Sequence, residues 1–169
     1  SNLKQVGVAF LQYEQDYEET CTPTNTNPPG FNGFPMNAGF MPWTILIQPY
    51  MKSYQALACP SDAGKPNGSR CETSYVINHC HDGGWGNISG FSGNGPHMEA
   101  ESQCSLASVQ APANTVACLE ASNYWEFWIP SPYQLDMGWY NTHRHNDIAN
   151  VLFCDGHVKG MKKGGITPT

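Results

Sequence analysis

The sequence predicts an α+β fold in which an N-terminal helix packs on an antiparallel β-sheet and disulfides pin long loops. Three observations favour this fold. An apolar stripe of helical period opens the chain, an Asp-Gly turn lies between two apolar segments near its end, and 7 cysteines accompany 17 glycines and 13 prolines. Chains of about this length usually form one domain, so we expect residues 1–169 to fold as a single unit.

The first element is a helix predicted over residues 2–19. Apolar residues recur at steps of three and four and therefore share one face, which we expect to pack on the sheet. This stripe consists of Leu3, Val6, Phe10, Tyr13 and Tyr17. Pro23 and the two residues before it are expected to end the helix. A surface loop then extends to residue 42, and a short second helix is expected around residues 44–51.

The predicted strands come later in the chain. Residues 74–78 and 115–120 have the apolar character of strands, and residues 150–154 and 157–161 flank Asp155-Gly156. We interpret Asp155-Gly156 as a two-residue hairpin turn with positive φ at both positions. This register places Phe153 opposite Val158 on the core face of the sheet.

Charge and hydropathy exclude some classes of partner. The net charge is -6 and only 13% of residues are charged, which argues against binding to nucleic acid or to an anionic membrane surface. The sequence has no run of 18 apolar residues, so we expect no membrane span in this chain.

The cysteines have none of the spacings typical of zinc ribbons or haem attachment, which favours disulfides in an oxidising compartment. Cys59 and Cys71 enclose a turn-rich loop, and Cys118 and Cys154 lie on predicted strands that can be neighbours. Because seven is odd, at least one cysteine stays free or bonds to another chain. We expect this to be Cys21, which follows the helix and precedes a Pro-rich loop. The full connectivity remains open.

Landmarks along the chain together resemble the H-X9-DG family of bacterial pilin-like and pseudopilin-like proteins. The opening Ser-Asn-Leu-Lys-Gln segment is one, and His145 followed after nine residues by Asp155-Gly156 is another. Between them, in the order typical of the family, come Trp43 to Tyr50, Cys59-Pro60-Ser61-Asp62 and Ser74-Tyr75-Val76-Ile77-Asn78.

The resemblance implies a non-catalytic structural subunit on a bacterial cell surface, which self-assembles into a filament, tube or pseudopilus. Identical subunits are then the expected partners, with secretion or pilus-assembly machinery. In the family an apolar helix precedes the opening segment. The sequence leaves open whether that helix was removed naturally or artificially, and it does not give the polymer symmetry or the biological use of the assembly.

The two named residues of the family motif are not expected to form a catalytic pair. Ten extended residues span roughly 30 Å, so His145 and Asp155 are predicted at opposite ends of one strand. Asp155 and Gly156 are explained by turn chemistry. We expect His145 to order the loop that enters the strand.

Two kinds of metal site are considered. Calcium is favoured over zinc, since some pseudopilins hold it in the loop before their last strands and oxygen ligands occur here at Glu126, Asp136, Asn141 and Asp147. The alternative is that the acidic groups are ordinary solvated carboxylates that bind no metal. Zinc is the weaker alternative. It requires the segments His79-Cys80-His81-Asp82 and 143–147 to meet in space.

Residues 122–144 form a predicted loop rich in aromatic side chains. Trp125, Trp128, Trp139 and Tyr140 are candidates for the subunit interface, because such residues bury much area and keep a polar tip. The same loop supports an alternative function, a cell-surface carbohydrate-binding module. A metal-dependent hydrolase is a more remote alternative, and the sequence has no G-x-S-x-G nucleophile motif.

Overall fold

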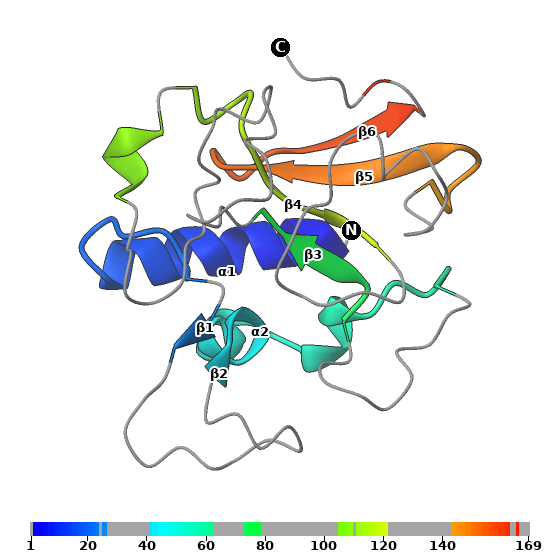
Figure 1. Ribbon diagram of the computed structural model, residues 1–169. Coiled ribbons are helices and arrows are strands. Elements are labelled where there is room, and N and C mark those ends of the chain that lie inside the picture. Colours follow the sequence, from blue (N-terminus) through cyan, green and yellow to red (C-terminus); the bar gives the residue numbers. More distant parts are fainter. Residues whose placement is uncertain are drawn as a thin grey trace, which may run out of the picture.

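The computed structural model describes residues 2–23, 25–26, 41–62, 73–78, 105–109, 111–121, 143–162 and 165, and the structural statements below concern these. Four strands form one antiparallel sheet in the order β3-β4-β5-β6. Their bounds are β3 Tyr75–Ile77, β4 Val116–Glu120, β5 Ile148–Phe153 and β6 Val158–Lys162. Helix α1, Asn2–Asp16, lies along this sheet (Figure 1). The predicted α+β fold with an antiparallel sheet is confirmed.

The remaining elements are short. β1 (Asn25–Thr26) pairs with β2 (Met41–Pro42) in a separate two-stranded sheet. Helix α2, Trp43–Leu46, and the 3-10 turn η1, Gln48–Tyr50, form the short helical segment that the sequence predicts. Two further 3-10 turns are η2, Tyr54–Leu57, and η3, Leu106–Ser108. Helix α1 is sandwiched between the β5–β6 hairpin on one side and η1 and η2 on the other.

Helix α1 ends earlier than the sequence predicts. Glu18 and Glu19 adopt left-handed backbone with φ of 54° and 57°, and the Glu19 amide donates to the Glu14 carbonyl at 2.8 Å. This bond closes the last turn of the helix as a Schellman-type end does, although neither left-handed residue is glycine. As a result Tyr17 lies beyond the helix and is exposed, while the other four residues of the predicted stripe are buried.

The hairpin between β5 and β6 differs from the predicted one. Leu152 pairs with Val158, and the Phe153 amide donates to the His157 carbonyl at 2.9 Å, so the turn contains three residues, 154–156. Only Gly156 has positive φ, at 85°. A type I turn followed by one left-handed residue explains this geometry. The predicted register, with Phe153 opposite Val158, is therefore wrong by one residue.

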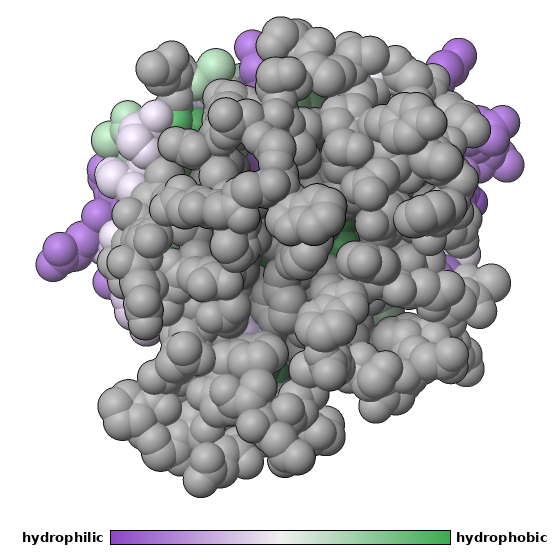
Figure 2. Space-filling view, viewed as in Figure 1, coloured by the Kyte–Doolittle hydropathy of each residue, from purple (hydrophilic) through white to green (hydrophobic). Residues whose placement is uncertain are grey.

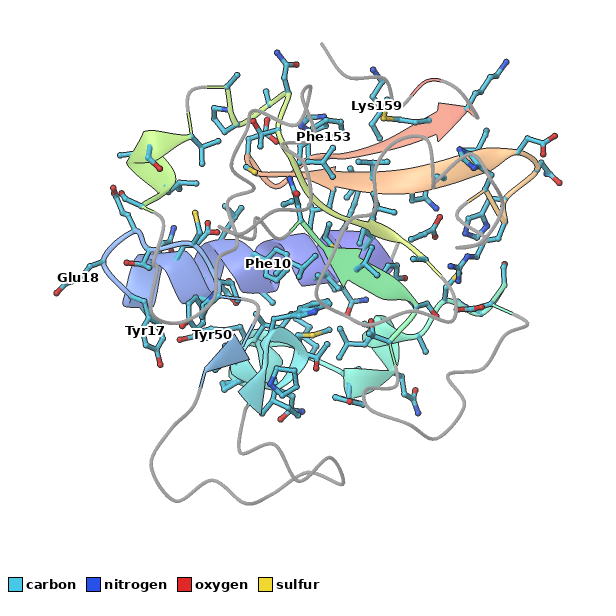
Figure 3. The ribbon with its side chains drawn as sticks, viewed as in Figure 1. Phe10, Tyr17, Glu18, Tyr50, Phe153 and Lys159 are labelled. Carbon is cyan, nitrogen blue, oxygen red and sulfur yellow. The ribbon has the colours of Figure 1, made fainter. Side chains whose placement is uncertain are left out.

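The core lies on both faces of the sheet. Leu152, Cys118 and Ile77 belong to a buried cluster that includes Phe10 on the apolar face of α1 (Figure 3). Trp43 belongs to the same cluster, and its ring lies edge-on to that of Phe10 with centroids 5.5 Å apart. A second buried cluster contains Val151, Phe153 and other residues of β3, β4 and β5. In Figure 2, the described residues that reach this face of the molecule are mostly hydrophilic and lie toward its margins. None of the helices in the described ranges has the length and apolarity that a membrane span needs.

Candidate functional site

Three side chains that are typical metal ligands or reactive groups converge at one end of the sheet. They are Cys59, just after η2, Glu120, at the end of β4, and His145, in the turn before β5. The His145 Nε2 atom lies 2.8 Å from Glu120 Oε1 and 3.5 Å from Cys59 Sγ. The three ligand atoms all lie within 4.8 Å of one another. We call these three residues the Cys-Glu-His cluster.

The fold holds the cluster in place through hydrogen bonds from neighbouring strands. On β5, Asn150 donates its backbone amide to Glu120 Oε2 at 2.8 Å and its side-chain amide to Oε1 at 3.0 Å. The Cys59 amide donates to the Ser74 hydroxyl at 2.9 Å. Asn150 on the adjacent strand anchors the carboxylate of Glu120, and the backbone amide of Cys59 anchors that residue to Ser74. Both residues are therefore held in position before a ligand binds.

Access to the cluster is one-sided. Cys59 and Glu120 are buried, whereas the side chain of His145 is 33% exposed. Beside it, Arg144 and Asp62 form an ion pair at 2.7 Å, with side chains only 2% and 3% exposed. The cluster is therefore open to solvent mainly through the imidazole of His145. The buried Arg144–Asp62 pair beside it has no net charge.

The surroundings of the cluster disfavour further negative charge. Burial raises the pKa of the Tyr75 hydroxyl, and the neighbouring Cys59 and Glu120 raise it further. Burial also raises the pKa of the Cys118 thiol, and Glu120 again adds to the effect. Both groups therefore stay protonated near neutral pH, and neither competes with the Cys-Glu-His cluster for a cation.

The geometry of the cluster argues against nucleophilic catalysis. In a Cys-His-carboxylate relay the thiol faces one ring nitrogen of the histidine and the carboxylate orients the other. Here Cys59 Sγ and Glu120 Oε1 both face Nε2 of His145. One nitrogen cannot accept the thiol proton while it donates to the carboxylate. The three groups instead converge on a single point, as ligands of a metal ion do.

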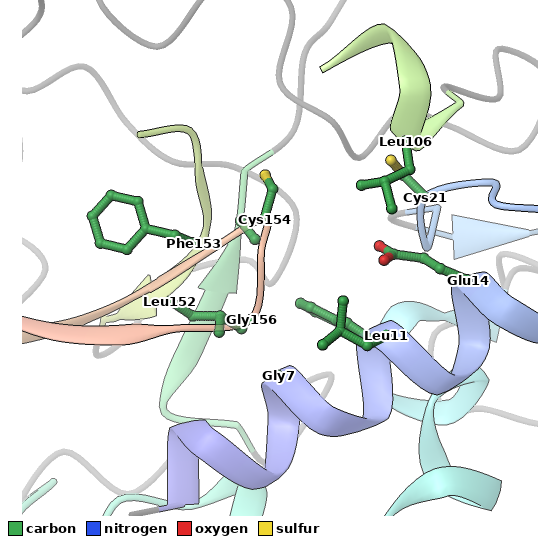
Figure 4. Close-up of a pocket in the computed structure, with 11 residues that line it drawn as sticks. Gly7, Leu11, Glu14, Cys21, Leu106, Leu152, Phe153, Cys154 and Gly156 are labelled. Carbon is green, nitrogen blue, oxygen red and sulfur yellow. The ribbon is translucent and has the colours of Figure 1, made fainter. Parts of the chain in front are cut away.

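A second feature is a small pocket between α1 and the β5–β6 hairpin (Figure 4). It has room for about one water molecule and is lined by Glu14, Cys21, Leu106 and Cys154 among others. Glu14 is only 5% exposed, and burial raises its pKa to about 7. The pocket is too small for a substrate, so we treat Glu14 as a buried acid that bears on stability.

The predicted disulfides are not formed. Cys59 carries a free thiol and faces His145, while Cys71 lies outside the described residues. Cys118 is also a free thiol. Cys118 pairs with Leu152 on β5, whereas Cys154, two residues further along, donates its amide to the Thr115 carbonyl at 2.9 Å. The two cysteines are therefore not cross-strand neighbours.

Cys21 is not placed as the intermolecular disulfide requires. Its side chain is 2% exposed and lines the pocket beside Glu14. A second chain cannot reach a thiol at this position without local opening, because Cys21 is covered from solvent.

The motif residues lie where the strand geometry predicts. His145 and Asp155 flank β5, and His145 forms a two-residue turn to Ile148 with Asn146 and Asp147 at positive φ. Asp155 Oδ1 accepts the His157 amide at 3.1 Å, which is the expected turn chemistry. The strand separates the two residues, which agrees with their not forming a catalytic pair.

Of the predicted calcium ligands, Asp147 is the one within the described residues, and it is exposed in the turn after His145. Glu126, Asp136 and Asn141 lie outside them, as do His79, Cys80 and His81 of the zinc alternative. The interface candidates Trp125, Trp128, Trp139 and Tyr140 also lie outside the described residues.

Glu120 is the site residue that the sequence did not indicate. It closes a predicted strand of otherwise apolar residues, and a carboxylate at a buried strand end was the available signal. The sequence predicts Cys59 in a disulfide, whereas its contact with His145 joins residues 86 positions apart. A local sequence pattern cannot predict a contact between residues so far apart in the chain.

Comparison with known proteins gives no match to a family model, a curated protein or a solved structure.

Proposed function

We propose that this protein is an extracellular, pilin-like structural subunit that assembles with identical copies into a filament, tube or pseudopilus. The observation that carries the proposal is that the landmarks of the H-X9-DG resemblance, which are scattered along the sequence, join into one structural unit around α1.

Contacts between the landmarks support the proposal. The Cys59-to-Asp62 segment contacts the H-X9-DG motif twice, through Cys59 with His145 at 3.5 Å and through Asp62 with Arg144 at 2.7 Å. The opening segment reaches the same region, since Asn2 donates to the Ala58 carbonyl at 2.9 Å. Contacts of this kind are expected if the landmarks of the resemblance together form one structural unit.

The approach of α1 to the last hairpin adds a second line of support. A Cβ atom built at Gly7 would lie 2.7 Å from Leu152 Cδ1 and 3.3 Å from the Gly156 carbonyl oxygen. The helix of the opening landmark therefore packs directly on the turn of the closing one. A helix held against an antiparallel sheet is the architecture that the pilin-like resemblance implies.

The location outside the cell rests on the resemblance, because Cys59 and Cys118 carry free thiols and give no disulfide to support it. Assembly is expected to use contacts between globular domains. On α1, Val8 is 53% exposed amid a polar face, and we assign it to a contact between subunits.

The test is negative-stain electron microscopy and light scattering of the untagged protein at high concentration. Regular polymers are expected, and Val8→Lys should abolish them while leaving the melting temperature unchanged. Lys159→Glu on β6 is the matched control at another exposed position. A protein that stays monomeric at high concentration, with no ordered species in the microscope, would contradict the proposal.

A further inference from the structure

We propose that the Cys-Glu-His cluster is a binding site for a divalent transition metal ion, with zinc as the best fit. The ion would link three segments of the chain: the residues after η2, the end of β4 and the turn before β5. This inference does not depend on assembly of the protein into a polymer.

The distances fit a tetrahedral zinc ion. Zn–S bonds of about 2.3 Å and Zn–N bonds of about 2.0–2.1 Å place sulfur and nitrogen about 3.5 Å apart at tetrahedral angles. Cys59 Sγ and His145 Nε2 are separated by 3.5 Å. Glu120 Oε1 lies 2.8 Å from the same nitrogen, in a hydrogen bond. The carboxylate oxygen has to move away by roughly 0.5 Å to reach its position on the tetrahedron.

The ligand chemistry selects the kind of ion. A thiolate and an imidazole favour zinc and other transition metals, whereas calcium and magnesium prefer oxygen ligands. One thiolate, one carboxylate and one neutral imidazole together balance the charge of a divalent cation. The site is therefore distinct from the calcium site that the sequence suggested around Asp147.

The supporting contacts are those that metal sites use. Both oxygens of the Glu120 carboxylate already accept hydrogen bonds from Asn150, which orients the ligand from the adjacent strand. Because His145 is one-third exposed while Cys59 and Glu120 are buried, an ion can enter from the histidine side. The same opening leaves a fourth position for water, as in zinc sites with three protein ligands.

The first experiment titrates the purified protein, freed of metal, with Co²⁺ alone. A thiolate ligand gives a charge-transfer band in the near ultraviolet, and tetrahedral coordination gives intense ligand-field bands in the visible. We expect both at one equivalent of Co²⁺. Cys59→Ser should lose the charge-transfer band, and His145→Gln should weaken binding at least tenfold.

Two control variants separate this site from other thiols and imidazoles. Cys154→Ala removes a thiol at the opposite end of β5, and His157→Gln removes an exposed imidazole near the hairpin turn. Both should bind Co²⁺ as the original protein does. Equal binding by Cys59→Ser, His145→Gln and the original protein would overturn the proposal, as would the absence of a thiolate band at saturating Co²⁺.

The second experiment measures thermal unfolding with Zn²⁺, since ligand binding to the folded state raises its melting temperature. At a free concentration 100-fold above Kd, the melting temperature should rise by roughly 5–10 °C. His145→Gln, whose side chain is partly exposed, should fold without metal and lose this rise. A Zn²⁺-induced rise of the same size in His145→Gln would contradict the assignment.

Discussion

At the scale of single residues, the two buried glutamates of the described ranges, Glu14 and Glu120, differ in their hydrogen-bond donors. Glu120 accepts three hydrogen bonds from Asn150 and His145. In contrast, Glu14 has an oxygen, Oε2, with no hydrogen-bond partner. Burial raises the pKa of Glu14 to about 7. A buried carboxyl oxygen without a hydrogen-bond partner therefore makes Glu14 a pH-sensitive point in the core.

We predict that Glu14 makes the folded protein less stable as pH rises. The pKa of Glu14 is above its ordinary value of 4.5, so the folded state favours the neutral form. Its stabilising contribution is fully present below pH 4.5 and is lost as pH rises through about 7. The loss is at most about 3 kcal/mol, which corresponds to several degrees in melting temperature.

The measurement compares melting curves between pH 5 and pH 8. Glu14→Gln should remove much of the decline, because it keeps the shape and loses the titration. Glu18→Gln is the control, since Glu18 is an exposed carboxylate that points away from the molecule (Figure 3). An unchanged decline in Glu14→Gln would show that another group governs it.

At the scale of elements, the contact between α1 and the last hairpin depends on two glycines. Gly7 on α1 faces the hairpin, and Gly156 in the hairpin turn faces α1. Gly7 lets the helix approach Leu152, and Gly156 lets the turn approach Leu11. Glycine is needed at both positions because neighbouring atoms lie too close for a Cβ atom, and at Gly156 also because φ is positive. A larger side chain at either position would have to separate the helix from the hairpin.

Gly156→Ala should lower the free energy of unfolding by about 1–2 kcal/mol, because φ at this position is 85°. The new Cβ would also lie 2.6 Å from Leu11 Cδ1. Urea unfolding of Gly156→Ala, Leu11→Ala and the double variant separates the two causes. We expect the double variant to lose less stability than the sum of the single ones, since Leu11→Ala removes the clash. Strict additivity would mean that the backbone angle alone accounts for the effect.

At the scale of the whole molecule, long-range polar contacts join segments that no strand pairing connects. The Asp62–Arg144 ion pair and the Cys-Glu-His cluster both tie the segment after η2 to the turn before β5. The sheet then connects that turn to the hairpin on which α1 packs. In the described residues, the segment Cys59–Asp62 is held to the turn before β5 by these buried polar contacts.

Removal of one partner of the buried ion pair should be strongly destabilising. Asp62→Asn leaves the Arg144 guanidinium without its carboxylate, and we expect a loss of about 3 kcal/mol in the free energy of unfolding. The double variant Asp62→Leu, Arg144→Met should recover much of that loss, because it removes both charges. Chemical denaturation of the original protein and of both variants measures these losses. Equal losses in the single and double variants would show that the pair is not coupled.

Local signals in the sequence by themselves determined much of the fold. Helical periodicity placed Leu3, Val6 and Phe10 on the buried face of α1, and apolar strand segments located β3 and β4. The Asp155-Gly156 pair marked the last hairpin, although the actual turn is one residue longer. These features are readable because each depends on residues only a few positions apart.

Only the tertiary structure decided the register and the candidate site. The register of β4 on β5 places Cys118 opposite Leu152, two residues before Cys154, and no periodicity in the sequence signals that register. The cluster joins Cys59 to His145 across 86 positions and depends on the order of the strands. Such contacts form only when segments distant in the sequence pack together, so no local segment of the sequence determines them.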